Sequence, residues 1–269
     1  MRITISCILI LLAGYVLLAG CSSPAVSSAK LTKQAEQEGK LKAMNTAAAE
    51  MYRLTKEGYY KEARDQLLQF SNLMTHVSYE HVTTAEGMNA LSALVVEARG
   101  VYTQVKLSPE QALIVSAKLR LAADALIHSE SPMWLDYRKT FRADAEKLRA
   151  ALKAKQAAEA TAQLQVFNQH YQIIRPAVLI TSAPSLVEKL DSWFIFMHGL
   201  LSQPNVDYKK ANVGAMHTDE LIAELFGGAE REAIVPPAAD QSTILWATVL
   251  SAIIITVLAY VGWRKYNVT

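Results

Sequence analysis

Apolar residues recur at steps of three and four along most of the chain between residues 31 and 226. Two of these series are Tyr60, Ala63, Leu67, Phe70, Met74 and Trp134, Tyr137, Phe141, Ala145, Leu148, Leu152. This spacing places the apolar side chains on one face of an α-helix. Residues 31–226 are therefore predicted to form an all-α domain, an antiparallel helical bundle or helical-hairpin array of seven or eight helices.

Residues that favour helix ends mark where several of these helices are predicted to begin and stop. Gly58 is predicted to end one helix, because glycine tolerates the left-handed backbone conformation found there. A serine or threonine before a proline or an acidic residue is typical of a helix start. Such starts are predicted at Ser108-Pro109, Ser131-Pro132, the Ser185/Glu188 capping box and Thr218.

A continuous apolar stretch near the C-terminus, residues 244–263, is predicted to be a transmembrane helix. Its 20 residues carry no charge, and about 20 residues are needed to cross a hydrocarbon core of roughly 30 Å. Aromatic and basic residues that favour the membrane interface stand near its ends: Trp246, Tyr260, Trp263, Arg264 and Lys265. The positive-inside rule makes residues 264–269 a cytoplasmic tail and places the preceding domain outside.

Residues 1–20 are predicted to be a signal peptide that ends in a lipobox. A basic residue precedes the apolar run 3–18, and Leu18-Ala19-Gly20-Cys21 resembles the bacterial lipobox, which is cut before a cysteine that carries diacylglycerol. Cys21 is therefore the predicted lipidation site. The sequence leaves two alternatives open: cleavage further on, near Ala29, and an uncleaved signal anchor. In each case the helical domain lies on the outer face of the membrane.

Two segments rich in small residues, Pro or Gly flank the helical domain. Residues 21–30 contain several Ser and Ala with Pro24, and residues 227–243 carry paired glycines and prolines. Such compositions are typical of tethers and linkers. The chain is thus predicted to be a single-pass protein of the bacterial cell membrane, with its domain outside and its C-terminus in the cytoplasm.

The charge of the domain and its lack of cysteine pairs argue against some partners and some kinds of site. Three of the 27 Lys and Arg residues lie beside the two apolar ends of the chain. The domain between them therefore has 24 basic and 25 acidic residues and is nearly neutral. A nucleic-acid-binding domain would need a basic stripe, so nucleic acid is not an expected partner. The two cysteines are Cys7 and Cys21. Cys7 lies in the signal, so neither a disulfide nor a zinc cluster is expected in the domain.

No catalytic or cofactor motif stands out in the sequence. The six histidines show neither HxxxH nor HExxH spacing, and there is no glycine-rich phosphate loop and no Gly-x-Ser-x-Gly elbow. Acidic pairs such as Asp144 with Glu146 are interpreted as solvated helix surface. We therefore expect no enzyme activity, no cofactor and no metal site.

The remaining candidates are three aromatic residues and one charged pair. Trp134, Trp193 and Phe196 are interpreted as core packing, with an exposed anchor for a partner as the alternative. Arg120 and Asp124 are spaced i, i+4. They are expected to form either a helical ion pair or part of a buried polar network.

Four segments of the domain carry a family resemblance. They are Gly58-x-Tyr60-x-Glu62-Ala63, residues 119–125 running to Pro132-Met133-Trp134, residues 171–176 and residues 187–192. Together they resemble the sporulation protein YpjB family of endospore-forming bacteria, including its single C-terminal membrane helix. The resemblance implies a role in spore formation and supplies no chemistry. The first segment is also similar to the turn and second helix of a tetratricopeptide unit, although no second copy follows.

These features predict a membrane-anchored extracytoplasmic helical interaction or scaffold protein that acts in spore formation and binds another protein. The alternative is a ligand-binding receptor or sensor with a pocket between helices, lined by the aromatic residues around Trp193. A filled core with an exposed apolar surface would favour the first function. A deep pocket with several titratable groups would favour the second.

Overall fold

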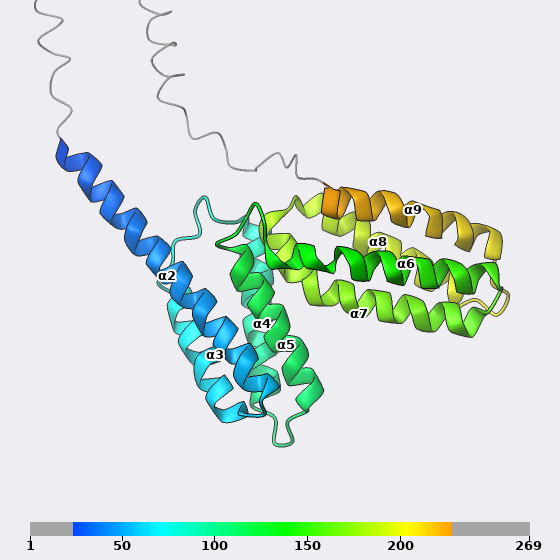
Figure 1. The fold of residues 1–269 in the computed structure, drawn as a ribbon, viewed down its shortest axis with the longest axis horizontal. Coiled ribbons are helices and arrows are strands. Elements are labelled where there is room, and N and C mark those ends of the chain that lie inside the picture. The colour runs from blue at the N-terminus through cyan, green and yellow to red at the C-terminus, as the bar shows by residue number, and fades with distance from the viewer. Residues whose placement is uncertain (1–23, 228–269) are drawn as a thin grey trace, which may run out of the picture. The chain divides into compact units, whose positions relative to one another are not determined.

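The computed structural model describes the backbone of residues 24–227 and the side chains of residues 33–227. Within these residues the chain forms eight α-helices and one short 3₁₀ helix, with no strand (Figure 1). This confirms the all-α class and the expected number of helices. In chain order the elements are α2 (Pro24–Lys56), α3 (Tyr60–Met74), α4 (Ala85–Tyr102), α5 (Pro109–Ala125), η1 (Met133–Tyr137), α6 (Arg138–Lys153), α7 (Ala157–Thr181), α8 (Pro184–Leu201) and α9 (Tyr208–Gly227).

The predicted membrane elements lie outside the described residues. This applies to the signal peptide, the lipidation site Cys21, the span 244–263, the tail 264–269 and the interface residues Trp246, Tyr260, Trp263, Arg264 and Lys265. Among the helices that the structure describes, none is both long and apolar enough to cross a bilayer. The described residues up to Ile222 form one compact unit, and residues 223–227 belong to a second unit.

The first described helix begins earlier than the sequence indicated. α2 starts at Pro24, so most of the predicted tether 21–30 is helical. The interpretation as a tether rested partly on Pro24, but proline is well suited to the first turn of a helix, where its missing N–H has no intrahelical partner. The small Ser and Ala residues that follow are compatible with helix.

Two of the predicted helix ends are confirmed. Ser108 is the N-cap of α5, where its side-chain oxygen accepts a hydrogen bond from the backbone N–H of Gln111 at 3.3 Å, and Pro109 opens the helix. Gly58 follows the end of α2 with φ at +86°, the left-handed region in which a Cβ atom is unfavourable. It lets the chain turn from α2 into α3.

At Ser131 and Ser185 a helix does begin within two residues of the predicted start, but another residue is the N-cap, and the start predicted at Thr218 is wrong. Ser131 precedes a short 3₁₀ helix whose N-cap is Pro132, and Ser185 lies inside α8, which begins at Pro184 after the N-cap Ala183. Thr218 is buried within α9, where its hydroxyl donates to the carbonyl of Ala215 one turn earlier. A hydroxyl that bonds back to its own helix needs no helix terminus, so the apolar face of α9 continues through this position.

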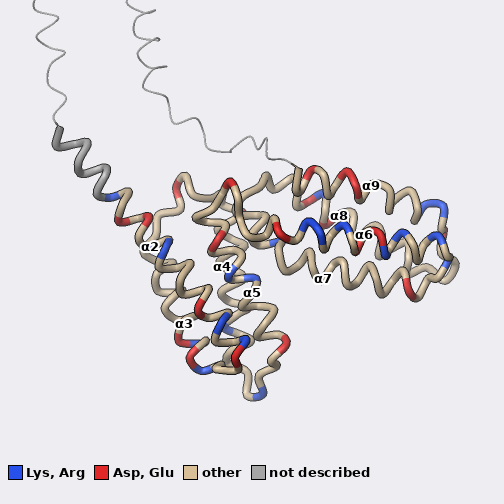
Figure 2. The backbone as a smooth tube through the Cα atoms, viewed as in Figure 1, with Lys and Arg blue, Asp and Glu red and all other residues tan. Residues whose placement is uncertain are grey.

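Helix α7 is central to the packing of the described domain. It packs against α6 and α8 and also against α4 and α5, whereas α2 packs against α3 and α5. Its 25 residues carry only two formal charges, on Glu159 and Arg175, and Figure 2 shows a helix that is almost free of charged positions. A helix with neighbours on several sides has little surface left for solvated charges.

Aromatic side chains fill the core between α6, α7 and α8. The Phe141 ring is fully buried and meets Phe167 edge to face, with 5.2 Å between the ring centroids. Phe167 in turn meets Phe194, also at 5.2 Å. The stripe that begins at Trp134 therefore faces the interior, as its spacing predicted, although its first residues belong to η1 and the rest to α6.

The start of α4 and the end of α7 meet almost backbone to backbone at Gly87. A Cβ atom at Gly87 would lie 3.0 Å from the carbonyl oxygen of Leu179 and 3.1 Å from the Cα atom of Ile180. Beside it, the Thr83 hydroxyl donates to the carbonyl oxygen of Ile180 at 2.9 Å. This contact holds α4 against α7, and the absence of a side chain at Gly87 permits it.

Candidate functional site

The three predicted aromatic residues lie in different surroundings. Trp134 is fully buried, and its indole N–H donates to the Thr181 hydroxyl at 3.1 Å. Trp193 is also buried and donates to the carbonyl oxygen of Gly214 at 2.9 Å. Phe196 differs, because half of its surface is exposed. Both tryptophans are thus core residues, and of the three only Phe196 is available to a partner.

Asp124 and Arg120 do not form the ion pair that their spacing suggested. The Asp124 carboxylate is buried and accepts hydrogen bonds from His128 Nδ1 at 2.6 Å and from the backbone N–H of Met133 at 2.7 Å. It therefore joins the end of α5 to the start of η1, as a buried polar residue. Arg120 turns the other way, and its guanidinium lies 5.1 Å from the centre of the Tyr52 ring on α2.

Asp144 was interpreted as solvated helix surface, and this is wrong. Its side chain is buried and accepts a hydrogen bond from His170 Nδ1 on α7 at 2.6 Å. The sequence did hold a signal, because Asp144 follows Phe141 by three residues and precedes Leu148 by four, so it lies on the apolar stripe of α6. The partner, His170, could not be read from spacing.

A second polar contact, partly buried, joins α7 to α8. Arg175 binds both carboxylate oxygens of Asp191, with Nε–Oδ1 at 3.0 Å and Nη2–Oδ2 at 2.6 Å, and the Tyr171 hydroxyl donates to the same Asp191 at 2.8 Å. These residues come from two segments that carried the family resemblance, 171–176 and 187–192.

The electrostatics of this contact follow from burial and hydrogen bonding. Burial raises the pKa of the Tyr171 hydroxyl well above its ordinary value, and the hydrogen bond to Asp191 raises it further. Burial opposes ionisation of Asp191, but hydrogen bonds from Arg175 and Tyr171 outweigh it and hold the pKa of the carboxyl below its ordinary value. The group is a charged clamp between two helices.

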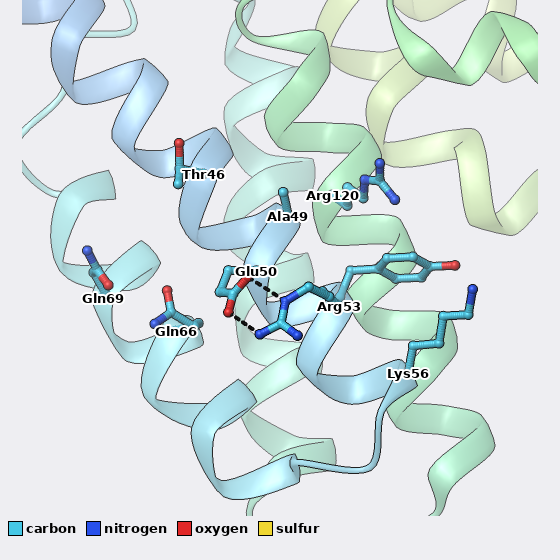
Figure 3. Close-up of a pocket in the computed structure, with 9 residues that line it drawn as sticks. Thr46, Ala49, Glu50, Arg53, Lys56, Gln66, Gln69 and Arg120 are labelled. Carbon is cyan, nitrogen blue, oxygen red and sulfur yellow. Dashed lines mark hydrogen bonds and ion pairs between the residues drawn. The ribbon is translucent and has the colours of Figure 1, made fainter.

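A groove runs along the outer face of α2, with a volume of about 700 Å³ and a wide opening to solvent (Figure 3). It is lined by side chains from α2, α3 and α5: Thr46, Ala49, Glu50, Tyr52, Arg53, Lys56, Gln66, Gln69 and Arg120. None of the aromatic residues around Trp193 lines it. Phe167 and Phe194 pack against the Trp193 ring, with centroids 5.7 and 4.9 Å away, so the space there is filled. In the described part of the chain, no three His, Cys, Asp or Glu residues are grouped as metal ligands.

Both α8 and α9 carry exposed large apolar side chains. We call this set the α8–α9 apolar surface: Ile195 (73% exposed), Phe196 (50%), Val213 (52%) and Met216 (69%). The two helices meet closely at Gly214, since a Cβ atom there would lie 3.0 Å from the Phe196 ring. Phe196 therefore lies beside the point where the two helices touch. Sequence reasoning named only Phe196 of this set, because apolar residues on the outer side of a helix do not follow the core period.

Comparison with known proteins identifies the family. The family model "Sporulation protein YpjB (SpoYpjB)" matches residues 41–269, which include α3 to α9 and the second half of α2. The chain belongs to this family. It is also similar to the "Uncharacterized protein YpjB" of Bacillus subtilis (strain 168), with 21% identity over 239 residues that cover 87% of this chain and 88% of the relative. No solved structure matches the chain. Family membership points to a role in spore formation, as the sequence resemblance implied.

Proposed function

We propose that this protein is a membrane-anchored extracytoplasmic helical protein that binds another protein during spore formation and catalyses no reaction. The α8–α9 apolar surface carries the proposal. Large apolar side chains that form one continuous exposed surface are typical of interaction sites, and the proposal takes these four residues to form such a surface. An aromatic residue beside the line where two helices touch is the kind of residue that dominates protein interfaces.

The filled core also supports this function over the receptor alternative. The space around Trp193 is occupied by Phe167 and Phe194, whereas a small-molecule receptor would need a concave, largely enclosed pocket there. The membrane anchor rests on the apolar run 244–263 and the basic residues that follow it. A partner anchored in or near the same membrane would meet the α8–α9 apolar surface at a raised effective concentration.

Paired substitutions test the proposed surface in sporulating cells. The variant Ile195→Ser with Phe196→Ser removes apolar area from the surface and leaves the buried Trp193 and Met197 in place. The control variant Leu68→Ser with Val96→Ser removes exposed apolar side chains elsewhere, on α3 and α4. At equal protein abundance in the membrane fraction, the first variant is expected to reduce the yield of heat-resistant spores and the control to leave it unchanged. Equal spore yields from both would contradict the proposal.

Photo-crosslinking tests directly for a protein partner at the α8–α9 apolar surface. A photoreactive amino acid at position 195 is expected to give a discrete crosslinked product in sporulating cells, and the same residue at position 96 is not. Protection of the domain from protease added to intact protoplasts would contradict the extracytoplasmic location. Absence of any product from position 195 would count against a stable protein partner at this surface.

A further inference from the structure

The side chain of Arg120 places a positive charge in the groove along α2 described above, called the α2 groove. No acidic side chain of the described residues neutralises this charge. Its helical neighbour Asp124 is turned inward, where it binds His128 and the backbone N–H of Met133. The Arg120 guanidinium instead lies over the Tyr52 ring, 5.1 Å from its centre. Among the described residues no carboxylate forms an ion pair with Arg120. An arginine stacked on an aromatic ring is held in one orientation, and its N–H groups remain free to bind a ligand.

Lys56 adds a second uncompensated cation on the same side of α2. Figure 3 shows Arg120 and Lys56 on one side of the helix, with the small Ala49 beside Arg120, while Gln66 and Gln69 lie on the other side. The described residues supply no acidic partner for Lys56.

The other charges of the groove compensate one another. Arg53 binds Glu50 through Nε at 2.8 Å and through Nη2 at 2.6 Å, and it binds Glu57 through Nη1 at 2.6 Å. These contacts hold the last turns of α2 together and leave Arg53 with little capacity for a ligand. The free positive charge of the groove therefore comes from Arg120 and Lys56.

A purely structural role explains only part of this arrangement. Lys56 lies in the last turn of α2, where the helix dipole favours a cation. The last turn of α5 contains no basic residue, so Arg120 does not serve that purpose. A guanidinium held over an aromatic ring, next to a lysine and at the edge of a groove, is the donor set that binds phosphate.

We propose that Arg120, Lys56 and Tyr52 form a binding site for a phosphate-bearing ligand. The two uncompensated positive charges match the charge of a phosphate monoester, about −1.5 to −2 at neutral pH. A carboxylate carries only one negative charge and would leave one cation unmatched. The phosphate group can belong to a soluble molecule or to a lipid headgroup. The site is separate from the α8–α9 apolar surface, and the proposal does not depend on the function proposed above.

Phosphorus NMR of the full-length chain in an uncharged detergent tests the site. The probes are inorganic phosphate, glycerol phosphate, and phosphatidic acid (a lipid with a phosphate monoester headgroup) added to the micelles, with phosphatidylcholine as the lipid control. The variants are Arg120→Gln and Lys56→Gln, and the matched control is Lys139→Gln, an exposed lysine on α6. Far-ultraviolet circular dichroism before and after thermal unfolding checks that each variant folds as the unaltered chain does.

The expected result is saturable broadening of the phosphorus signal of a probe, from which its affinity is measured. Arg120→Gln is expected to weaken this affinity at least about tenfold, the loss typical of a charge-assisted hydrogen bond. Lys56→Gln is expected to weaken binding severalfold, and Lys139→Gln to leave it unchanged. Binding of glycerol phosphate assigns the site to the phosphate group itself, and binding of phosphatidic acid alone assigns it to a lipid headgroup. No binding of any probe at millimolar concentration, equal binding by Arg120→Gln, or tighter competition by acetate than by phosphate would overturn the proposal.

Discussion

Substituting alanine for two glycines of the same helix is expected to change stability in opposite directions. Gly87 and Gly100 both lie in α4, where alanine has a higher helix propensity by up to about 1 kcal/mol. At Gly100 a Cβ atom would meet nothing within 4 Å. Gly100→Ala is therefore expected to stabilise the domain by about 0.5–1 kcal/mol.

At Gly87 the contact with α7 outweighs helix propensity. The added Cβ atom would lie 3.0 and 3.1 Å from backbone atoms of Leu179 and Ile180, which cannot rotate away, and within 2.1 Å of the Thr83 hydroxyl oxygen. Separating the helices costs about 1–3 kcal/mol of packing, and losing the Thr83–Ile180 hydrogen bond costs about 0.5–1.5 kcal/mol. After subtraction of a propensity gain of about 1 kcal/mol, Gly87→Ala is expected to destabilise the domain by about 0.5–3.5 kcal/mol.

Urea unfolding of residues 30–226, followed by circular dichroism at the helix band, measures both changes. The expected signature is a lower midpoint for Gly87→Ala, a higher midpoint for Gly100→Ala, and the same slope for both. If Gly87→Ala raises the midpoint as Gly100→Ala does, the start of α4 is not in backbone contact with α7, and the reasoning fails. A changed slope would instead show an altered unfolded state or an additional folding intermediate.

The core, the charged clamp and the sequence ends each give a further prediction. Phe141→Ala is expected to lower the free energy of unfolding by about 3–5 kcal/mol, since the ring is fully buried, and an unchanged urea midpoint would exclude this. The folded-state pKa of Asp191 is lowered, so ionised Asp191 adds to the free energy of unfolding above its ordinary pKa of about 4. This contribution is lost as the pH falls through the folded-state pKa, and Asp191→Asn is therefore expected to reduce the loss of stability in acid. The raised pKa of Tyr171 has the opposite sign, so its contribution is lost above about pH 10, and Tyr171→Phe is expected to weaken the alkaline loss of stability. Cell fractionation is expected to find both Cys21→Ser and a chain lacking residues 244–269 in the membrane. The combined variant is expected to be released if its signal is cut near Ala29 and to be retained by the signal if it is not cut; a mature N-terminus at Lys30, found by mass spectrometry, would contradict lipidation.

Local pattern was enough to predict the helices and some of their ends. The period of the apolar residues depends on the geometry of one helix, so it could be read without knowledge of the neighbours. Gly58 and Ser108 act through the backbone of their own turns, and both behave as predicted. The prediction at Ser185 missed the helix start by two residues, because Pro184 opens α8. The prediction at Thr218 failed because a threonine hydroxyl can bond back to its own helix, so this residue type is tolerated inside α9.

The pairing of polar residues was decided by the tertiary structure. Asp124 had an arginine at the favourable spacing, yet it binds His128 and Met133 because the end of α5 turns into η1 there. Asp144 meets a histidine 26 residues away, and Asp191 meets an arginine 16 residues away. A single sequence shows which residues can be partners, and only the packing of helices shows which of them meet.

The amino-acid sequence was sufficient for the all-α class, the apolar stripe that contains Phe141 and the family to which the chain belongs. The folded chain was needed to show that Trp134 and Trp193 are core residues, that Phe196 is exposed, and that Arg120 faces a groove. The physical reason is the separation along the chain of the residues that interact. Helix periodicity and capping depend on interactions within about four residues, whereas burial and charge compensation depend on side chains that only the folded chain brings together.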